Sequence, residues 1–287
     1  MKRRFDVSGK TAIITGGARG IGLGCAQALA KRGARVVIVD LDQTASDAAA
    51  SQVTNDSFGI AADVTDRGAM RQVVADVTKE MGGVDLVIAN AGIASRGATL
   101  RAMSGEVADR VLAVNLDGVF NTVLAALPQI AERRGHIVVT SSVYAFVNGM
   151  GAAPYAMSKA GVEQLGRALR VELVPHGAGA SVAYFGFIDT KMVHQAVDAD
   201  PEIDNLSELL PKLLLKRLSP DKAGEAVARG IEKRAPRIIA PRRWAAVSAL
   251  RGIVNPFVDS YMTRNARMQE LVGTLDKRGD EDQPTTA

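Results

Sequence analysis

A tyrosine and a lysine four residues apart, Tyr155 and Lys159, form a pair whose spacing could do chemistry. On a helix the two side chains would lie on one face. An ammonium beside a phenol lowers the pKa of that phenol from about 10 toward neutral pH, so Tyr155 would become a usable general acid and base. Ser142 stands thirteen residues before Tyr155, just after an expected strand. The spacing by itself also fits an ordinary surface pair, so these residues must be considered together with the elements that carry them.

A glycine-rich turn, Thr15-Gly-Gly-Ala-Arg-Gly-Ile-Gly22, lies between an expected strand and an expected helix. Gly16 would allow the tight turn, Gly20 would let the backbone approach a ligand, and Gly22 would permit close packing of the helix on the strand. The pyrophosphate of a dinucleotide would meet the N-terminus of that helix. The alternative is a helix start with accidental glycines, which the strand–turn–helix context makes the weaker interpretation.

An acid and a cation near this turn favour different cofactors. Asp40 ends the second expected strand about 20 residues after the glycines, where its carboxylate would accept hydrogen bonds from the adenosine ribose hydroxyls. The same charge would repel a 2′-phosphate, so Asp40 favours NAD over NADP. Arg19 lies within the turn and could instead pair with a 2′-phosphate.

The elements that would position these groups alternate along the chain. Short apolar runs predict strands at 11–15, 35–40, 58–62, 84–89, 135–140, 180–184 and 237–240. Helices are expected between them, at 20–31, 43–53, 66–81, 106–132 and 160–174. This alternation predicts an α/β fold with one doubly wound parallel sheet, and the carboxyl ends of such strands are where ligands bind.

Composition excludes several other classes of protein. Of 287 residues, 47% are hydrophobic and 23% are charged, which is typical of a folded chain. The net charge of +4 is too small to indicate nucleic-acid binding, and no apolar run approaches the ~20 residues of a transmembrane segment. The basic start is not followed by an apolar signal segment, and the single cysteine, Cys25, permits no internal disulfide. We therefore expect a cytoplasmic protein.

Five motifs, in this order and spacing, resemble the short-chain dehydrogenase/reductase family. They are the glycine turn with its leading Thr15, Asn90-Ala-Gly92, Asn115, Ser142, and Tyr155-x-x-x-Lys159. The resemblance runs from about Val7 to Met192 and implies a single-domain Rossmann-type fold with a nicotinamide cofactor. It implies that Tyr155 exchanges a proton with the substrate oxygen and that Ser142 hydrogen-bonds that oxygen. Lys159 would hold the nicotinamide ribose and lower the tyrosine pKa, while Asn115 would hold a water that links Lys159 to solvent.

The resemblance also implies a wider set of cofactor-binding residues. Asp63 and Val64 would meet the adenine, the Asn90-Ala91-Gly92 turn would pass beside the ribose, and Ile188 and Thr190 would bind the carboxamide. The whole expected set is Gly16, Arg19, Gly20, Ile21, Gly22, Asp40, Asp63, Val64, Asn90, Ala91, Gly92, Tyr155, Lys159, Ile188 and Thr190. For Asn90 an alternative stays open, in which its side chain only ties down neighbouring backbone. Phe185-Gly186 stands where the family usually has Pro-Gly, so the loop after that strand could take another path.

The second half of the chain contains the segments in which we expect substrate specificity to reside. Leucines at intervals of three and four give residues 190–220 an apolar face suited to a substrate lid; they are Leu206, Leu209, Leu210, Leu213, Leu214 and Leu218. A helical extension over 242–272 mixes apolar residues with arginines, which fits subunit packing, a flap over the site, or contact with an anionic membrane surface. We prefer subunit packing. We take residues 1–275 as one domain and 276–287 as a disordered tail.

These observations predict an NAD-dependent oxidoreductase that interconverts an apolar, lipid- or steroid-like secondary alcohol and a ketone. A homo-oligomer, either a dimer or a tetramer, is expected, with no nucleic-acid partner. The three histidines are far apart in the sequence, so no metal site is expected. Two alternatives remain, a non-catalytic dinucleotide-sensing or scaffold protein of the same fold, and an epimerase or dehydratase.

Overall fold

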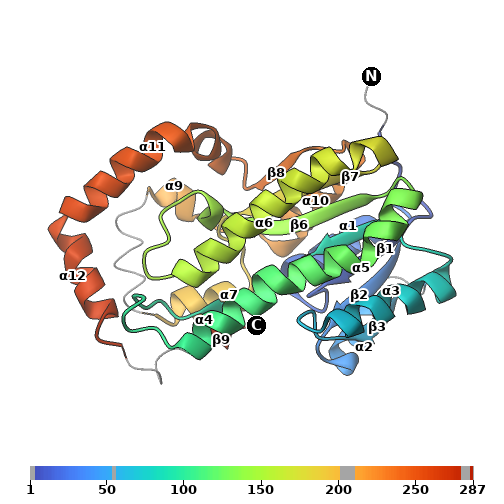
Figure 1. Cartoon of the computed structure of the whole chain (residues 1–287), viewed down its shortest axis with the longest axis horizontal. Coiled ribbons are helices and arrows are strands. Elements are labelled where there is room, and N and C mark those ends of the chain that lie inside the picture. Colours follow the sequence, from blue (N-terminus) through green and yellow to red (C-terminus); the bar gives the residue numbers. More distant parts are fainter. Residues whose placement is uncertain (1–3, 54–55, 201–210, 279–284, 287) are drawn as a thin grey trace.

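The computed structural model describes residues 4–53, 56–200, 211–278 and 285–286. Its centre is a seven-stranded parallel sheet (Figure 1). Across the sheet the strands are β3 (Phe58–Ala61), β2 (Arg35–Asp40), β1 (Thr11–Thr15), β4 (Leu86–Ala89), β6 (His136–Ser142), β7 (Gly179–Phe185) and β8 (Arg237–Ala240). The order reverses beside β1, so the carboxyl ends of β1 and β4 border a crevice. The prediction of a doubly wound parallel sheet is confirmed.

Helices cover both faces of this sheet. One face carries α1 (Gly20–Ala30), α2 (Gln43–Ser51) and α10 (Pro220–Glu232), and the other carries α3 (Arg67–Met81), α5 (Gly118–Glu132) and α6 (Ala153–Glu172). Helices α1 and α10 cross in backbone contact. A Cβ on Gly24 would lie 2.4 Å from the Pro220 oxygen, and one on Gly224 would lie 2.1 Å from the Gly24 oxygen. Glycine at both positions therefore fixes how closely these helices approach.

The long helix predicted over 106–132 is divided in the structure. It runs as α4 (Gly105–Leu112), a π-helical turn (Ala113–Asp117) and α5. The combined helix is long and apolar enough to cross a membrane by length and composition. Its apolar side chains Val119, Val123 and Ile130 are nevertheless buried, and α5 packs on β4, β6 and α3. It is thus a core helix of this fold.

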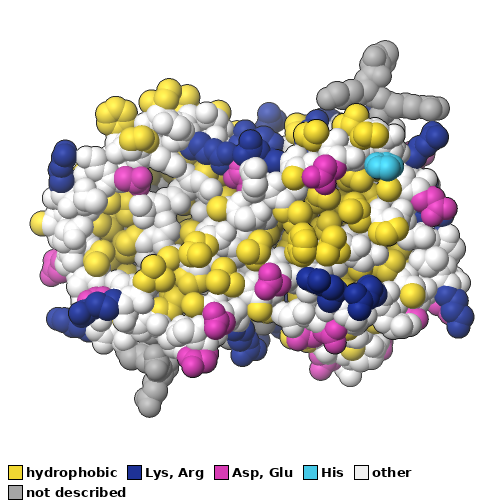
Figure 2. All heavy atoms as spheres, viewed as in Figure 1, with side chains coloured by type: hydrophobic (Ala, Val, Ile, Leu, Met, Phe, Trp, Pro, Cys, Tyr) yellow, Lys and Arg dark blue, Asp and Glu magenta, His cyan; other side chains and the backbone are white. Residues whose placement is uncertain are grey.

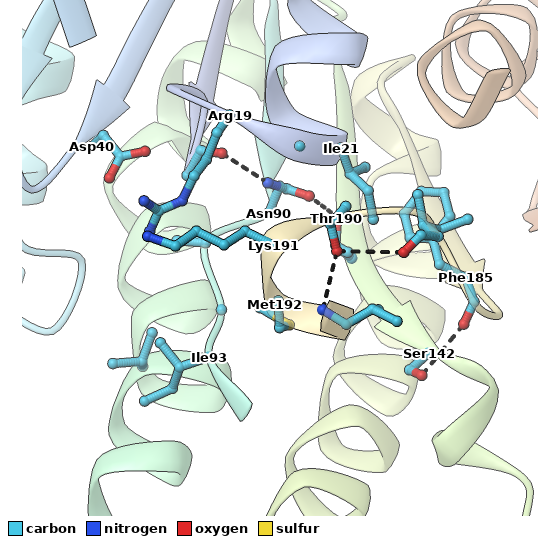
Figure 3. Close-up of a pocket in the computed structure, with 18 of the residues that line it drawn as sticks. Arg19, Ile21, Asp40, Asn90, Ile93, Ser142, Phe185, Thr190, Lys191 and Met192 are labelled. Carbon is cyan, nitrogen blue, oxygen red and sulfur yellow. Dashed lines mark hydrogen bonds between the residues drawn. The ribbon is translucent and has the colours of Figure 1, made fainter. Parts of the chain in front are cut away.

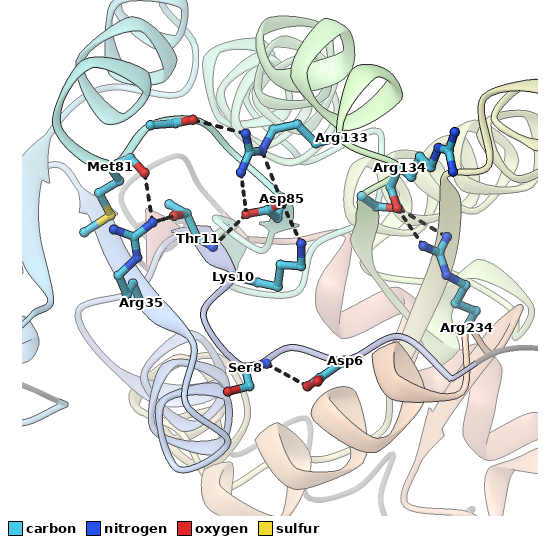
Figure 4. A network of polar contacts seen from close by, with 12 residues as sticks. Asp6, Ser8, Lys10, Thr11, Arg35, Met81, Asp85, Arg133, Arg134 and Arg234 are labelled. Atoms are coloured by element: carbon cyan, nitrogen blue, oxygen red, sulfur yellow. Dashed lines mark hydrogen bonds and ion pairs between the residues drawn. The ribbon is translucent and has the colours of Figure 1, made fainter.

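The amino ends of the strands are held by a polar network (Figure 4). Asp85 accepts hydrogen bonds from the Thr11 amide and from the side chains of Lys10 and Arg133. Nearby, His136 is fully buried, and its Nε2 lies 2.8 Å from the Ser181 hydroxyl. Because that hydroxyl donates to the Ala235 oxygen, Nε2 carries the histidine proton. This end of the sheet serves stability and lies away from the crevice.

The remaining elements connect or extend this core. After β7 come α7 (Lys191–Val193), a π-helical turn (His194–Asp198) and α9 (Lys212–Leu215). Short 3₁₀ turns occupy Val143–Ala145 and Val174–His176. Helices α11 (Trp244–Arg264) and α12 (Ala266–Leu275) form an arc at one side of the molecule (Figure 1). Of the predicted lid, Leu206, Leu209 and Leu210 lie outside the described residues, while Leu218 pairs with Ile188.

The end of the chain differs from the expected disordered tail. Asp276 accepts hydrogen bonds from Thr99 and Arg101, and Arg278 forms an ion pair with Asp200. Further on, β9 (Thr285–Thr286) pairs antiparallel with β5 (Ala94–Ser95). The prediction of a disordered tail beginning at Asp276 is therefore corrected for these positions, because Asp276 finds partners on the loop after β4 and Arg278 finds one on the segment after β7. Residues 279–284 and 287 lie outside the described part of the chain.

Candidate active site

A cavity of about 390 Å³ opens at the carboxyl ends of the central strands (Figure 3). It brings together segments that are far apart in the sequence, from the turn after β1 to the loop after β7. Most predicted site residues line it: Gly16, Arg19, Gly20, Ile21, Asp40, Asp63, Val64, Asn90, Ala91, Gly92, Ser142, Tyr155, Lys159, Ile188 and Thr190. The other two, Gly22 and Asn115, lie behind its wall, where they pack against lining residues.

The glycine turn is shaped by close backbone contacts. Gly16 and Gly20 have positive φ angles of 63° and 55°, which favour glycine. A Cβ on Gly16 would lie 2.8 Å from the Ala91 Cα, and one on Gly22 would lie 2.1 Å from the Gly16 oxygen. Side chains at these positions would therefore collide with the turn itself. Gly20 faces Thr190, whose Cγ2 would lie 3.3 Å from an added Cβ.

Asp40 is held at the rim of the cavity by two backbone amides. Its Oδ2 accepts a hydrogen bond from the Ala18 amide at 3.1 Å, and its Oδ1 accepts one from the Leu41 amide at 2.9 Å. The carboxylate is thereby fixed beside the glycine turn. Arg19 and Lys191 extend toward the same part of the cavity (Figure 3). The sequence argument identified Arg19 but missed Lys191, which lies one residue beyond the recognised loop motif.

Asn90 is tied to the backbone of the glycine turn. Its Nδ2 donates to the Thr15 and Gly16 oxygens, at 3.2 Å each. The Thr15 hydroxyl in turn accepts hydrogen bonds from the amides of Asn90 and Ala91, at 3.1 and 3.3 Å. These contacts join the turns after β1 and β4 and agree with the structural interpretation of Asn90.

Asn115 is fully buried within the π-helical turn. Its Oδ1 accepts from the Ile93 amide at 2.7 Å, and its Nδ2 donates to the Ile93 oxygen at 2.9 Å. A Cβ on Gly92 would lie 3.1 Å from Asn115 Oδ1 and 3.4 Å from Lys159 Nζ. Asn115 and Lys159 therefore meet at Gly92, where there is little room for a side chain.

Tyr155 and Lys159 lie on one helix, because α6 begins at Ala153 rather than near residue 160 as predicted. Lys159 Nζ lies 5.5 Å from the centroid of the Tyr155 ring and donates a hydrogen bond to the Thr140 oxygen at 3.2 Å. Ser142 ends β6, and its hydroxyl donates to the Phe185 oxygen at 3.3 Å. Helix α6 and strands β6 and β7 thus converge on one wall of the cavity.

The protonation of this group differs from the sequence-based expectation. Burial raises the pKa of Tyr155 to about 12, although a hydrogen bond with Ser142 opposes the rise. Burial also lowers the pKa of Lys159 to about 8. The expected lowering of the tyrosine pKa is therefore wrong for this structure, since the cost of removing the phenolate from water is the largest contribution to this pKa. Tyr155 holds its proton firmly at neutral pH.

The loop after β7 turns back toward the glycine turn. The Gly186 amide donates to the Ala240 oxygen, and a Cβ on Gly186 would lie 2.3 Å from Trp244 Nε1. Thr190 caps the short helix α7 by accepting from the Val193 amide at 3.4 Å. Glycine at position 186 therefore makes room for Trp244, a contact that the sequence analysis did not predict.

Further lining residues were missed because they belong to no recognised motif. Helix α4 contributes Arg110, the π-helical turn contributes Val114, helix α7 contributes Val193, and the loops contribute Ile93 and Asp189. Their proximity arises only from the folded arrangement. Among the residues that the structure describes, no group of three or more His, Cys, Asp or Glu side chains could hold a metal ion.

A family model described as short chain dehydrogenase matches residues 10–201. The chain belongs to the short-chain dehydrogenase family. Members of this family normally use a nicotinamide dinucleotide.

Two curated relatives and one solved structure illustrate this membership. The probable oxidoreductase EphD of Mycobacterium tuberculosis is 35% identical over 244 residues, which cover 81% of this chain but only 41% of that protein. The chain thus spans about two fifths of that relative's length. The oxidoreductase UcpA of Salmonella typhimurium is 33% identical over 237 residues, 77% of this chain and 87% of UcpA. A short-chain type dehydrogenase/reductase from Mycobacterium marinum superposes with a TM-score of 0.71 at 29% identity, covering 82% of this chain and 94% of that one. The curated relatives named here are described as oxidoreductases.

Proposed function

We propose that this oxidoreductase interconverts a secondary alcohol and a ketone by hydride transfer with NAD(H). The observation that carries the proposal is the placement of Tyr155, Ser142 and Lys159 on one wall of the cavity that begins at the glycine turn. A proton donor thereby stands beside the space that a dinucleotide would occupy. Tyr155, Ser142 and Lys159 would move that proton without a metal ion.

The cavity fits a dinucleotide in shape and in polarity. Gly16 and Gly20 leave a cradle at the start of α1 that larger residues would fill, and the helix N-terminus favours the pyrophosphate. Asp40 would accept hydrogen bonds from the adenosine ribose, and Asp63 with Val64 would border the adenine. Ile188 and Thr190 would hold the carboxamide end. When bound, the nicotinamide supplies or accepts the hydride.

The chain's own residues handle the proton and the orientation. In the reductive direction, Tyr155 donates its hydroxyl proton to the substrate carbonyl oxygen, and Ser142 hydrogen-bonds that oxygen. The carbonyl carbon gains the hydride and the oxygen gains the proton, so the alcohol forms without a covalent enzyme intermediate. Lys159 would hold the ribose and return a proton to Tyr155, while Asn115 fixes the turn against which Lys159 packs.

NAD preference follows from the fixed carboxylate of Asp40. Two backbone amides hold its oxygens, so it cannot easily turn away from a 2′-phosphate. Like charges in such proximity cost several kcal/mol. Arg19 and Lys191 line the same cavity and would attract that phosphate, but they equally suit the pyrophosphate that NAD and NADP share.

An apolar substrate suits the lining of the cavity. Ile93, Met192 and Val193 lie in its wall, and Phe185 replaces the usual proline beside the site. A lipid- or steroid-like alcohol would bury apolar surface there. A cytoplasmic location and a homo-oligomer remain predictions.

One experiment separates this proposal from a dinucleotide sensor and from an epimerase or dehydratase. Purified protein is titrated with NAD, NADH, NADP and NADPH by calorimetry, and then incubated with a panel of secondary alcohols and ketones while the reduced cofactor is followed by absorbance. We expect tighter NAD binding and net formation or loss of NADH with an apolar member of the panel. Dinucleotide binding without turnover on any member would favour the sensor, whereas substrate conversion without net change in NADH would favour an epimerase or dehydratase.

A further inference from the structure

Helix α11 exposes an apolar face that the oxidoreductase chemistry does not use. Leu250, Ile253, Phe257 and Tyr261 are 50%, 66%, 74% and 55% exposed. Their spacing of three, four and four residues places them on one side of the helix. The opposite side packs on the protein, where Trp244 and Ser248 are buried. The arc of α11 and α12 stands out from the sheet (Figure 1), and yellow side chains project from its outer edge in Figure 2.

Positive charges flank this apolar face. Arg242 precedes α11, Arg264 ends it three residues after Tyr261, and Arg267 follows in α12; all three are exposed. The only acid within α11 is Asp259, two residues from Phe257 and thus on the opposite side, where it accepts a hydrogen bond from Asn148. The exposed face of α11 therefore combines apolar residues with cations and lacks a carboxylate, while α12 carries the exposed Glu270 three residues after Arg267.

We propose that α11 binds the surface of an anionic lipid bilayer and lies in its plane. The apolar side chains would insert partly into the bilayer, which removes their surface from water. The arginines at both ends would reach lipid phosphates, as in amphipathic interfacial helices. Charge complementarity decides against a second copy of this chain. Pairing two such faces, parallel or antiparallel, would bring arginine ends against arginine ends without a carboxylate on either face. The expected burial of this helix between subunits is therefore the weaker interpretation.

The start of α11 connects this surface to the candidate active site. Trp244 opens the helix and packs against Gly186 in the loop after β7, and the neighbouring Arg243 donates to the Lys216 oxygen after α9. A bilayer beneath α11 would thus border the segments that surround the substrate end of the cavity. The proposal does not depend on the reaction assigned above, because it rests on the surface of α11 alone.

Vesicle co-sedimentation tests this inference directly. The full chain is mixed with vesicles of phosphatidylcholine alone, or with vesicles of phosphatidylcholine that contain about one third phosphatidylglycerol. Both mixtures are made at low and at high salt. We expect binding to the anionic vesicles, weakened by salt. Ile253→Ser with Phe257→Ser should reduce that binding by at least about tenfold. The matched control, Val171→Ser with Val174→Ser, removes two equally exposed apolar residues, 72% and 69% exposed, from another surface and should bind as the wild type does.

A second pair of variants isolates the charge contribution. Arg264→Gln with Arg267→Gln should lose most of the preference for anionic vesicles, whereas Arg71→Gln with Lys79→Gln on α3 should keep it. Circular dichroism verifies that each variant is folded, and light scattering gives its mass. The proposal is overturned if the folded wild type ignores anionic vesicles, or if Ile253→Ser with Phe257→Ser leaves binding unchanged. It is equally overturned if that variant splits an oligomer while vesicle binding is absent, which would assign the face to a second copy.

Discussion

Arg278 donates hydrogen bonds to both carboxylate oxygens of Asp200, with Nη1 2.7 Å from Oδ2 and Nη2 2.6 Å from Oδ1. Their side chains are only 8% and 1% exposed. The pair fastens the end of the chain to the segment that follows β7, and Arg278 also donates to the Gly97 oxygen. Arg96 Nε also lies 3.5 Å from Asp200 Oδ2, so two arginines compensate this buried carboxylate.

Breaking this ion pair should destabilise the protein. Arg278→Gln removes two charged hydrogen bonds from the buried Asp200 carboxylate, which keeps its ion pair with Arg96 at 3.5 Å, so we expect a cost of about 2 kcal/mol. We expect a clear drop in the melting temperature, whereas Lys277→Gln, at an exposed neighbour, should cause almost none. Adding Asp200→Asn to Arg278→Gln should recover part of the loss. Equal melting of the Arg278→Gln variant and the wild type would show that the ion pair contributes nothing.

Removing the Tyr155 hydroxyl should stop the chemistry and spare binding. Tyr155→Phe keeps the ring beside Lys159 but has no proton to give, so turnover should fall by ~10²–10⁴ while the Kd for NAD changes little. Tyr261→Phe makes the same chemical change on the outer face of α11 and should keep full turnover. Near-normal turnover by Tyr155→Phe would refute the assignment of the proton donor.

The lowered pKa of Lys159 predicts a pH dependence. Burial brings this pKa to about 8, so the ammonium loses its proton as the pH rises through that value. If the charge holds the ribose and supports Tyr155, ketone reduction should decline above pH ~8. Lys159→Arg keeps the charge at high pH, so its lower rate should stay level over that range. A wild-type rate that is constant from pH 7 to 9.5 would contradict this role.

Buried His136 should make the fold sensitive to acid. Its pKa falls from 6.5 to about 3, chiefly through burial and further through Arg234 and Arg170. The unfolded chain therefore binds one more proton between these values, and stability falls as the pH drops below 6.5. This group alone should cost about 2 kcal/mol between pH 7 and pH 5, measured by urea unfolding.

A substitution isolates that contribution. His136→Gln does not titrate, so its unfolding free energy should change less between the two pH values, even if it is lower at both. His176→Gln, at an exposed position, should behave as the wild type does. An unchanged pH dependence in His136→Gln would show that other groups cause the acid sensitivity.

Cofactor choice should respond to Asp40. Asp40→Ser removes the fixed charge beside the Ala18 amide but keeps a hydroxyl for the ribose, so NADP should gain at least about tenfold in affinity relative to NAD. Arg19→Gln should weaken NADP binding in that background, and Asp63→Ser should leave the ratio unchanged. The measurement is calorimetric titration with both dinucleotides. An unaltered ratio in Asp40→Ser would place the determinant elsewhere.

The sequence was sufficient to predict where the strands of the parallel sheet lie along the chain and most of the residues that line the cavity. Local patterns carry these features: apolar runs mark buried strands such as β2, and the glycines between β1 and α1 reflect a turn that excludes side chains. Tyr155 and Lys159 were paired by spacing, and the structure adds that α6 begins early enough to hold both.

Features that depend on distant partners could not be predicted in this way. The contact of Trp244 with Gly186 joins residues that no local pattern connects, and so does the pairing of Arg278 with Asp200. The tyrosine pKa was misjudged because spacing reports the neighbouring charge but not the burial that opposes it. The polar composition of residues 276–287 likewise gave no indication of the contacts that Asp276 makes.

The π-helical turn at Ala113–Asp117 has a consequence for how this chain can change its length. Such a turn accommodates one additional residue, so α4 and α5 keep the orientation that a continuous α-helix one residue shorter would give them. Deleting one residue from this turn should therefore leave Arg110 and Val119 on their present faces. The deletion would instead displace Asn115, whose side chain pairs with the backbone of Ile93.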